Sequence, residues 1–162
     1  MAHTQSLSLL PRNGHSVPFV ELRQSLASKV AAISPFTEQL MRFILNFRRA
    51  DESELDIEMA LHEALANAVI HGNGENSRKR VDVVCRCYMD GEVLITVRDE
   101  GRGFDSSAVL DPTFRENLLF THGRGIYLMK RLMDEVCFED GGSVVRMRKK
   151  SNAILAPERK AE

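Results

Sequence analysis

The stretch that most constrains the fold is a helical segment that ends in three polar residues. Glu63, Asn67 and His71 follow one another at intervals of four residues, which places them along one flank of an α-helix. An apolar stripe at helical spacing runs beside them: Ile57, Leu61, Ala64, Leu65 and Ala68. A carboxylate, an amide and an imidazole beside an apolar face indicate either a cleft or a plain polar helix edge. The segment by itself leaves both interpretations open.

The periodicities of the rest of the chain predict an α+β domain. Helices are predicted at 34–48, with Ser34 as N-cap, and from 51 or 53 to about 70, followed by H-G-N-G turn chemistry. A third helix is predicted within 123–134. Strands are predicted at 17–26, 81–87, 92–98, 135–139 and 143–148. This order predicts a two-layer sandwich, with a mostly antiparallel sheet and helices packed on one face.

The length of 162 residues suits one domain. We expect a flexible arm at 1–15, the domain at 16–150 and a polar tail at 151–162. The net charge of −1 gives no basic bias, and no apolar run reaches the roughly 18 residues of a membrane span, so neither nucleic acid nor a membrane is the expected partner. Cys85, Cys87 and Cys137 lack C-x-x-C spacing, which favours free thiols in a reducing cytoplasm.

Two glycine-rich motifs follow the Glu63/Asn67 helix, which makes three stations, or candidate site motifs, along the chain. Asp99-x-Gly101-x-Gly103 ends a predicted strand, and Gly123-x-Gly125 opens a predicted helix. Glycine lets the backbone approach a ligand closely, and a helix N-terminus offers free N–H groups to a phosphate. Either pair alone is also typical of turns and caps. The G-x-G-x-x-G dinucleotide fingerprint and the P-loop are both absent.

Together, in this order, the three stations resemble the N, G1 and G2 boxes of the GHKL ATPases, over about residues 55–148. The segments E-A-L-A-N-A-V-I-H-G, D-E-G-R-G-F-D and G-R-G-I-Y-L-M-K-R-L-M-D-E-V are similar to one branch, the bacterial anti-sigma-factor serine kinases. The resemblance implies a Bergerat-type fold that binds ATP and Mg²⁺. It also implies an anti-sigma factor that binds a sigma factor and phosphorylates a serine on an anti-anti-sigma antagonist. Relatives in this branch tend to be homodimers.

The resemblance further implies a role for each matching residue. Asn67 corresponds to the Mg²⁺ ligand, Glu63 to the general base, and Asp99 to the acceptor of the adenine amino group. The remaining nucleotide contacts would come from Gly101, Gly103, Gly123 and Gly125, and from Thr121, His122 and Arg124 beside the last glycine pair. The irregular segment 105–122 is predicted to be a lid, in which Arg115 and Asn117 are further candidates for a phosphate contact.

Two other functions fit the same motifs. The first is a non-catalytic ATP-binding switch that binds a protein partner, since the lid offers no assured cationic contact to the terminal phosphate. The second is the catalytic domain of a histidine kinase. His62-Glu63 has the dipeptide of a phosphoacceptor, but it lies inside the expected ATP site.

Overall fold

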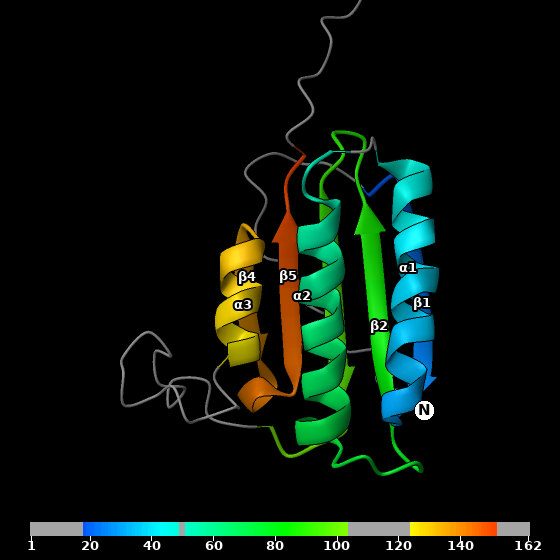
Figure 1. Ribbon diagram of the computed structural model, residues 1–162, viewed down its shortest axis with the longest axis vertical. Coiled ribbons are helices and arrows are strands. Elements are labelled where there is room, and N and C mark those ends of the chain that lie inside the picture. The colour runs from blue at the N-terminus through cyan, green and yellow to red at the C-terminus, as the bar shows by residue number, and fades with distance from the viewer. Residues whose placement is uncertain (1–17, 49–50, 104–123, 152–162) are drawn as a thin grey trace, which may run out of the picture.

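The computed structural model describes residues 18–48, 51–103 and 124–151. Three helices lie side by side on one face of a five-stranded sheet (Figure 1). The helices are α1 (Ile33–Phe47), α2 (Glu54–Ala66) and α3 (Arg124–Leu132), and a π-helix, η2 (Asn67–Gly72), continues α2. The strands are β1 (Val20–Ala27), β2 (Arg80–Cys87), β3 (Val93–Asp99), β4 (Glu135–Glu139) and β5 (Val144–Lys149). This arrangement confirms the predicted α+β sandwich.

The sheet has the order β1-β2-β3-β5-β4, and every neighbouring pair is antiparallel. The β2–β3 hairpin turns at Asp90-Gly91, where Gly91 has φ +81°, a conformation that glycine adopts without steric cost. The β4–β5 hairpin turns through a short 3₁₀ segment, η6 (Asp140–Gly142). Two hairpins joined at β3 and β5 therefore form most of the sheet, and β1 completes it beside β2.

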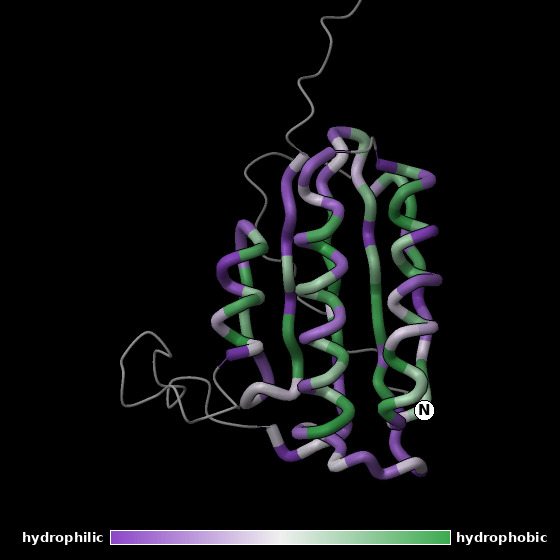
Figure 2. The backbone as a smooth tube through the Cα atoms, viewed as in Figure 1, coloured by the Kyte–Doolittle hydropathy of each residue, from purple (hydrophilic) through white to green (hydrophobic). Residues whose placement is uncertain are grey.

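The core lies between the helices and the inner face of the sheet, where apolar segments face one another (Figure 2). Val81, Val83, Cys85 and Cys87 alternate along β2 and are at most 1% exposed. Leu40 and Ile44 from α1 and Ile57, Leu61 and Leu65 from α2 are at most 1% exposed as well. The thiols of Cys85 and Cys87 are therefore buried, and all three cysteines are free, as the sequence predicts.

The start of α1 differs from the sequence prediction. A 3₁₀ turn, η1 (Val30–Ala32), precedes the helix, and Ala32 rather than Ser34 is the N-cap. Ser34 is therefore the second residue of the helix. Pro35 still lies in the first turn, where its missing N–H costs nothing.

The predicted arm at 1–15 and the predicted lid at 105–122 lie outside the described residues, as does the tail beyond 151. Within the described ranges, none of the helices is both long and apolar enough to cross a membrane.

Candidate functional site

A mostly apolar pocket opens where α2 ends, between η2, β3, α3 and the β4–β5 hairpin. Its walls are formed by Ala64, Asn67, Ala68, His71, Gly72, Val97, Asp99, Gly103, Ile126, Met129, Phe138, Gly142, Ser143 and Val145. Few of these residues carry a charge, and the apolar ones come from both layers of the sandwich. A mostly apolar pocket with a few convergent polar groups is typical of a small-molecule binding site.

The polar flank of α2 ends in a π-helix at the pocket. At Asn67 the α-helix gives way to the π-helix, which ends at Gly72, and the N–H of Asn73 donates to the carbonyl oxygen of Ala68 (2.8 Å). The sequence instead predicts a regular helix to about Ile70. Asn67, His71 and Gly72 of the π-helix line the pocket. Short π segments inside α-helices are frequent at functional sites.

Asp99 is the last residue of β3 and lines the pocket. Its Oδ1 accepts the main-chain N–H of Gly101 (2.7 Å), and its own N–H donates to the carbonyl oxygen of Ser143 (3.0 Å). Burial raises the pKa of Asp99 above its ordinary value, although the Gly101 hydrogen bond opposes this. Oδ2 receives no hydrogen bond from the described residues, so it is available to accept one from a ligand amino group.

The end of the helix packs directly on this aspartate. A Cβ atom added to Gly72 would lie 2.5 Å from Asp99 Oδ2, and one added to Gly101 would lie 2.6 Å from the carbonyl carbon of Gly72. Gly103, with φ +75°, lies against the β4–β5 turn in the same way: an added Cβ would be 2.7 Å from the carbonyl carbon of Gly141. Glycine is therefore required at all three positions, because any side chain would separate the elements that form the pocket.

The polar helix and the last glycine pair also meet. A Cβ atom added to Gly125 in the first turn of α3 would lie 2.6 Å from Glu63 Oε2 and 3.4 Å from Asn67 Nδ2. The structure thus brings Glu63, Asn67 and Gly125 together, as expected for parts of one site. Asn67 Nδ2 is buried and has no hydrogen-bond partner among the residues that the structure describes. A buried polar group without a partner costs free energy, so this amide is suited to a ligand that would satisfy it.

These residues fit a magnesium nucleotide. Mg²⁺ commonly takes one or two protein oxygens and completes its shell with phosphate and water, and an amide or carboxylate oxygen is the ligand type it prefers. Asn67 supplies such an amide oxygen, and both its side chain and the Glu63 carboxylate lie against the first turn of α3. The described residues contain no group of three or more His, Cys, Asp or Glu side chains that would hold a metal without a nucleotide.

The remaining predicted site residues are placed less fully. Arg124 is the first residue of α3 and is exposed. Thr121, His122 and Gly123 lie outside the described residues, as do Arg115 and Asn117.

The structure also adds residues that the motifs do not indicate. They are Gly72, Asn73, Phe138, Gly142 and Ser143. The glycines in H-G-N-G and Gly141-Gly142 predict only turns, although both turns form pocket walls. Phe138 alternates correctly for a buried strand, so its sequence position carries no separate signal for a ligand.

Three features define a nucleotide-binding domain of the ATPase type. They are the two-layer sandwich, the apolar pocket lined by Asp99, and the helix flank with Glu63 and Asn67 that lies against Gly125 of α3. Residues 26–149 match the family model described as histidine kinase-like ATPase domain, and the chain belongs to this family. ATP is accordingly the nucleotide that it uses. Within the family, the chain belongs to the branch of the anti-sigma factors and serine-protein kinases, as its relatives show.

Two relatives illustrate this branch. The chain is 33% identical to an anti-sigma F factor of Clostridium botulinum (strain Eklund 17B / Type B) over 150 residues, which cover 88% of this chain and 97% of the relative. It is 35% identical to the serine-protein kinase RsbW of Staphylococcus epidermidis over 120 residues, covering 67% and 76%. A crystal structure of the RsbU and RsbW domains of a Mycobacterium tuberculosis protein has the same fold. The TM-score is 0.54 at 24% identity, over 82% of this chain and 32% of that longer one.

Proposed function

We propose that this chain is an anti-sigma factor and an ATP-dependent serine-protein kinase that phosphorylates an anti-anti-sigma antagonist in a partner-switching system. The observation that carries the proposal is the meeting of Glu63, Asn67 and Gly125, with Glu63 Oε2 2.6 Å from the position of a Cβ on Gly125. This meeting supports the proposal because a carboxylate that could act as general base, an amide that could hold the metal of Mg-ATP and a helix N-terminus lie together. The names of the relatives support the same function.

The reaction would proceed by phosphoryl transfer to the antagonist's serine hydroxyl. Glu63 accepts the hydroxyl proton as the serine oxygen bonds to the γ-phosphorus, the bond from that phosphorus to the β,γ-bridging oxygen breaks, and ADP leaves with the electron pair. Asn67 would hold Mg²⁺, which neutralises charge on the phosphates. Asp99 Oδ2 would accept a hydrogen bond from the adenine amino group and so orient the nucleotide in the pocket. The added phosphate places negative charge on the antagonist's contact surface and releases it.

The substitution Glu63→Gln tests the catalytic part of the proposal. The isosteric amide cannot take the proton, so transfer of label from γ-labelled ATP to the antagonist should fall by about 10²–10⁴-fold. ATP affinity, measured by calorimetry, should change little. Glu58→Gln is the matched control, because Glu58 is an exposed residue of the same helix. Retained transfer in Glu63→Gln would exclude Glu63 as the base. ATP binding by the parent chain without transfer to a bound antagonist would instead support the non-catalytic switch.

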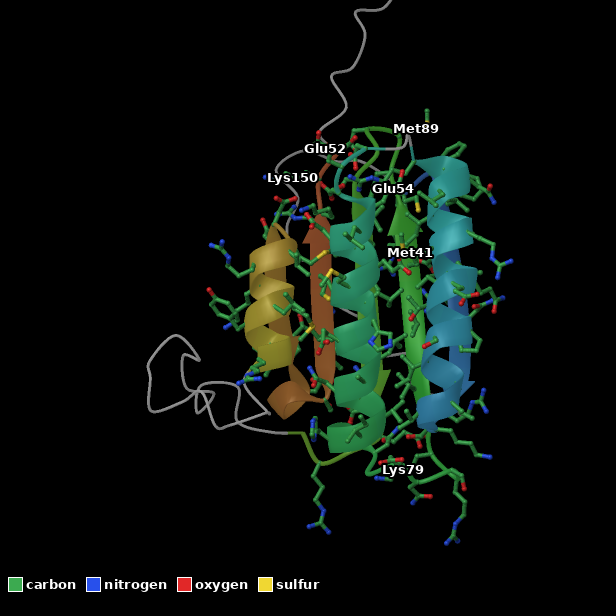
Figure 3. All side chains as sticks on the ribbon, viewed as in Figure 1. Met41, Glu52, Glu54, Lys79, Met89 and Lys150 are labelled. Carbon is green, nitrogen blue, oxygen red and sulfur yellow. The ribbon has the colours of Figure 1, made fainter. Side chains whose placement is uncertain are left out.

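We further propose that the chain works as a homodimer in the cytoplasm. Exposed apolar side chains at the end remote from the pocket support a protein contact there: Phe19 is 58% exposed, Phe47 39% and Met89 76%. Met89 is labelled in Figure 3, and the Phe19 and Phe47 rings are 6.0 Å apart. Light scattering of the purified chain should give the mass of two copies, and a monomer at micromolar concentration would exclude the dimer.

A further inference from the structure

The side chain of Asn73 joins three segments at the end of the molecule where the pocket opens. Asn73 directly follows η2 and is 4% exposed. Its Nδ2 donates to the carbonyl oxygen of Arg80 (2.8 Å), the first residue of β2. Its Oδ1 accepts the main-chain N–H of Glu100 (2.9 Å), which lies between Asp99 and Gly101. Lys79, labelled at this end in Figure 3, immediately precedes the β2 contact.

These hydrogen bonds act where the backbone segments touch without side chains between them. Gly72 stands directly before Asn73, and its Cα packs on the Asp99 carboxylate. Gly101 stands directly after Glu100 and packs on the Gly72 carbonyl group. The hydrogen bonds of the Asn73 side chain therefore lie beside the two glycine contacts that determine the position of Asp99. A glycine contact resists approach but not separation, whereas a hydrogen bond resists separation.

We propose that Asn73 is a positioning residue for base recognition, which holds Asp99 against the helix end and so makes the pocket selective for adenine nucleotides. The inference rests on the proposed function, because it takes the pocket to bind ATP with the adenine at Asp99. Asn73 itself contacts no nucleotide. It acts through the peptide that follows Asp99, and it links this peptide to the helix that carries Asn67.

Asparagine suits this position because the two contacts need opposite groups. One partner is a carbonyl oxygen, which requires a donor, and the other is an N–H, which requires an acceptor. An aspartate in its place would keep the acceptor but would set a second oxygen against the Arg80 carbonyl. Asn73→Asp therefore keeps the bond to Glu100 and loses the bond to Arg80, whereas the shorter side chain of Asn73→Ser loses both.

Calorimetric titration of Asn73→Ser, which loses the bond to Glu100 as well as the bond to Arg80, with Mg-ATP, Mg-ADP and Mg-GTP tests the inference. With Asp99 loosened, affinity for ATP and ADP should fall equally, by about tenfold, the equivalent of one hydrogen bond. Affinity for GTP should stay the same, because guanine presents an oxygen where adenine presents its amino group and gains nothing from Asp99. The ratio of ATP to GTP affinity should therefore fall by the same factor of about ten.

Asn76→Ser is the matched control. Asn76 is exposed in the same turn, and its Oδ1 accepts the N–H of Arg78 (3.0 Å), so the same substitution removes a side-chain hydrogen bond there as well. That bond makes no contact with the loop after β3, and its loss should leave both affinities unchanged. Melting temperatures of all variants are recorded, so that titrations are made where each chain is folded.

The outcomes separate the inference from the function beneath it. If the parent chain binds ATP, and folded Asn73→Ser keeps the parental ATP-to-GTP ratio, Asn73 merely stabilises the fold and the inference is wrong. If the parent chain binds no ATP, the proposed function fails first and the inference with it. Should Asn73→Ser not fold, Asn73→Ala, which also loses both bonds, is titrated instead, and the same ratio decides.

Discussion

Asp99 is a residue whose burial favours ligand recognition at the expense of stability. Its pKa is raised from 3.8 in the folded chain, mainly by burial. The unfolded chain solvates the charged form better, so the contribution of Asp99 to stability is complete below pH 3.8 and is lost as pH rises through the raised pKa. At neutral pH the folded chain therefore carries a carboxylate that the unfolded chain would accommodate at lower free energy.

We accordingly expect Asp99→Asn to raise the free energy of unfolding at about pH 7, with the gain disappearing as the pH falls toward 3.8. The same substitution should weaken ATP binding, since the charged acceptor for the adenine amino group is lost. Urea unfolding at several pH values and calorimetry measure the two effects. Asp82→Asn, at an exposed position of β2, is the control. Lower stability of Asp99→Asn at neutral pH would contradict the argument.

The substitution Gly125→Ala should also affect stability and activity in opposite directions. An alanine there favours the helix by about 1 kcal/mol over glycine, while its methyl group would lie 2.6 Å from Glu63 Oε2. The flexible end of Glu63 can swing away, so the fold should tolerate Gly125→Ala. Phosphoryl transfer should fall because the general base is displaced. Thermal unfolding and the labelled-ATP assay check this, and unchanged transfer in a folded variant would show that Glu63 is not positioned against α3.

At the scale of elements, Lys149 links strand β5 to the helices α2 and α3 by hydrogen bonds. This residue of β5 is 9% exposed, and its Nζ donates to Asp56 Oδ2 in α2 (2.8 Å) and to the carbonyl oxygen of Leu132 at the end of α3 (2.5 Å). One ammonium group thus satisfies a helix C-terminus and pairs with a carboxylate of the neighbouring helix.

Lys149→Met should reduce the free energy of unfolding by about 2 kcal/mol, the size expected for charge-assisted hydrogen bonds. Chemical denaturation measures the change. Lys150→Met is the adjacent control, because Lys150 is exposed and its main chain makes the bonds, to Asp134 and Arg48. Equal losses in the two variants would mean that the Lys149 contacts contribute nothing specific.

The elements themselves are largely predictable from the sequence, whereas their ends are not. Alternation along β2 and the stripe of α2 determine which residues are buried, because a period of two or of 3.6 leaves one face for the core. The predicted start of α1 is wrong because a 3₁₀ turn precedes the helix and moves its N-cap to Ala32, ahead of Ser34. The π-helix at Asn67 has no pattern of its own in the sequence.

At the scale of the whole molecule, nucleotide and fold are linked by mass action. Mg-ATP at about 100 times its Kd should stabilise the chain by about 2.7 kcal/mol, which corresponds to about 5–10 °C in Tm for this size. Chelation of magnesium should reduce the shift in the parent chain. In Asn67→Ala the shift should be smaller and insensitive to chelation. Asn46→Ala, exposed on α1, is the control. A chelator-sensitive shift in Asn67→Ala would exclude Asn67 as the magnesium ligand.

The sequence predicts the residues of the candidate site that would contact the nucleotide. It does not predict the residues that hold the walls of the pocket together. Glu63, Asn67, Asp99 and Gly125 are recognised because their types recur with a function. Asn73 and Gly72 act through long-range contacts with β2 and with the loop after β3. The sequence alone does not show that the end of η2, the start of β2 and the loop after β3 meet, because these segments are far apart along the chain.

The π-helix also bears on how such a protein can change in evolution. A π turn closes over one residue more than an α turn, so the loss of one codon within Asn67–Gly72 would let α2 continue as an ordinary α-helix. The segments on either side of the deletion would keep nearly the same relative rotation, because the wider turns already take up the extra residue. The loss would fall on the stretch whose Asn67, His71 and Gly72 line the pocket, while the upstream core of Ile57, Leu61 and Leu65 would stay buried. A lineage could thus alter its pocket and keep its scaffold in a single genetic event.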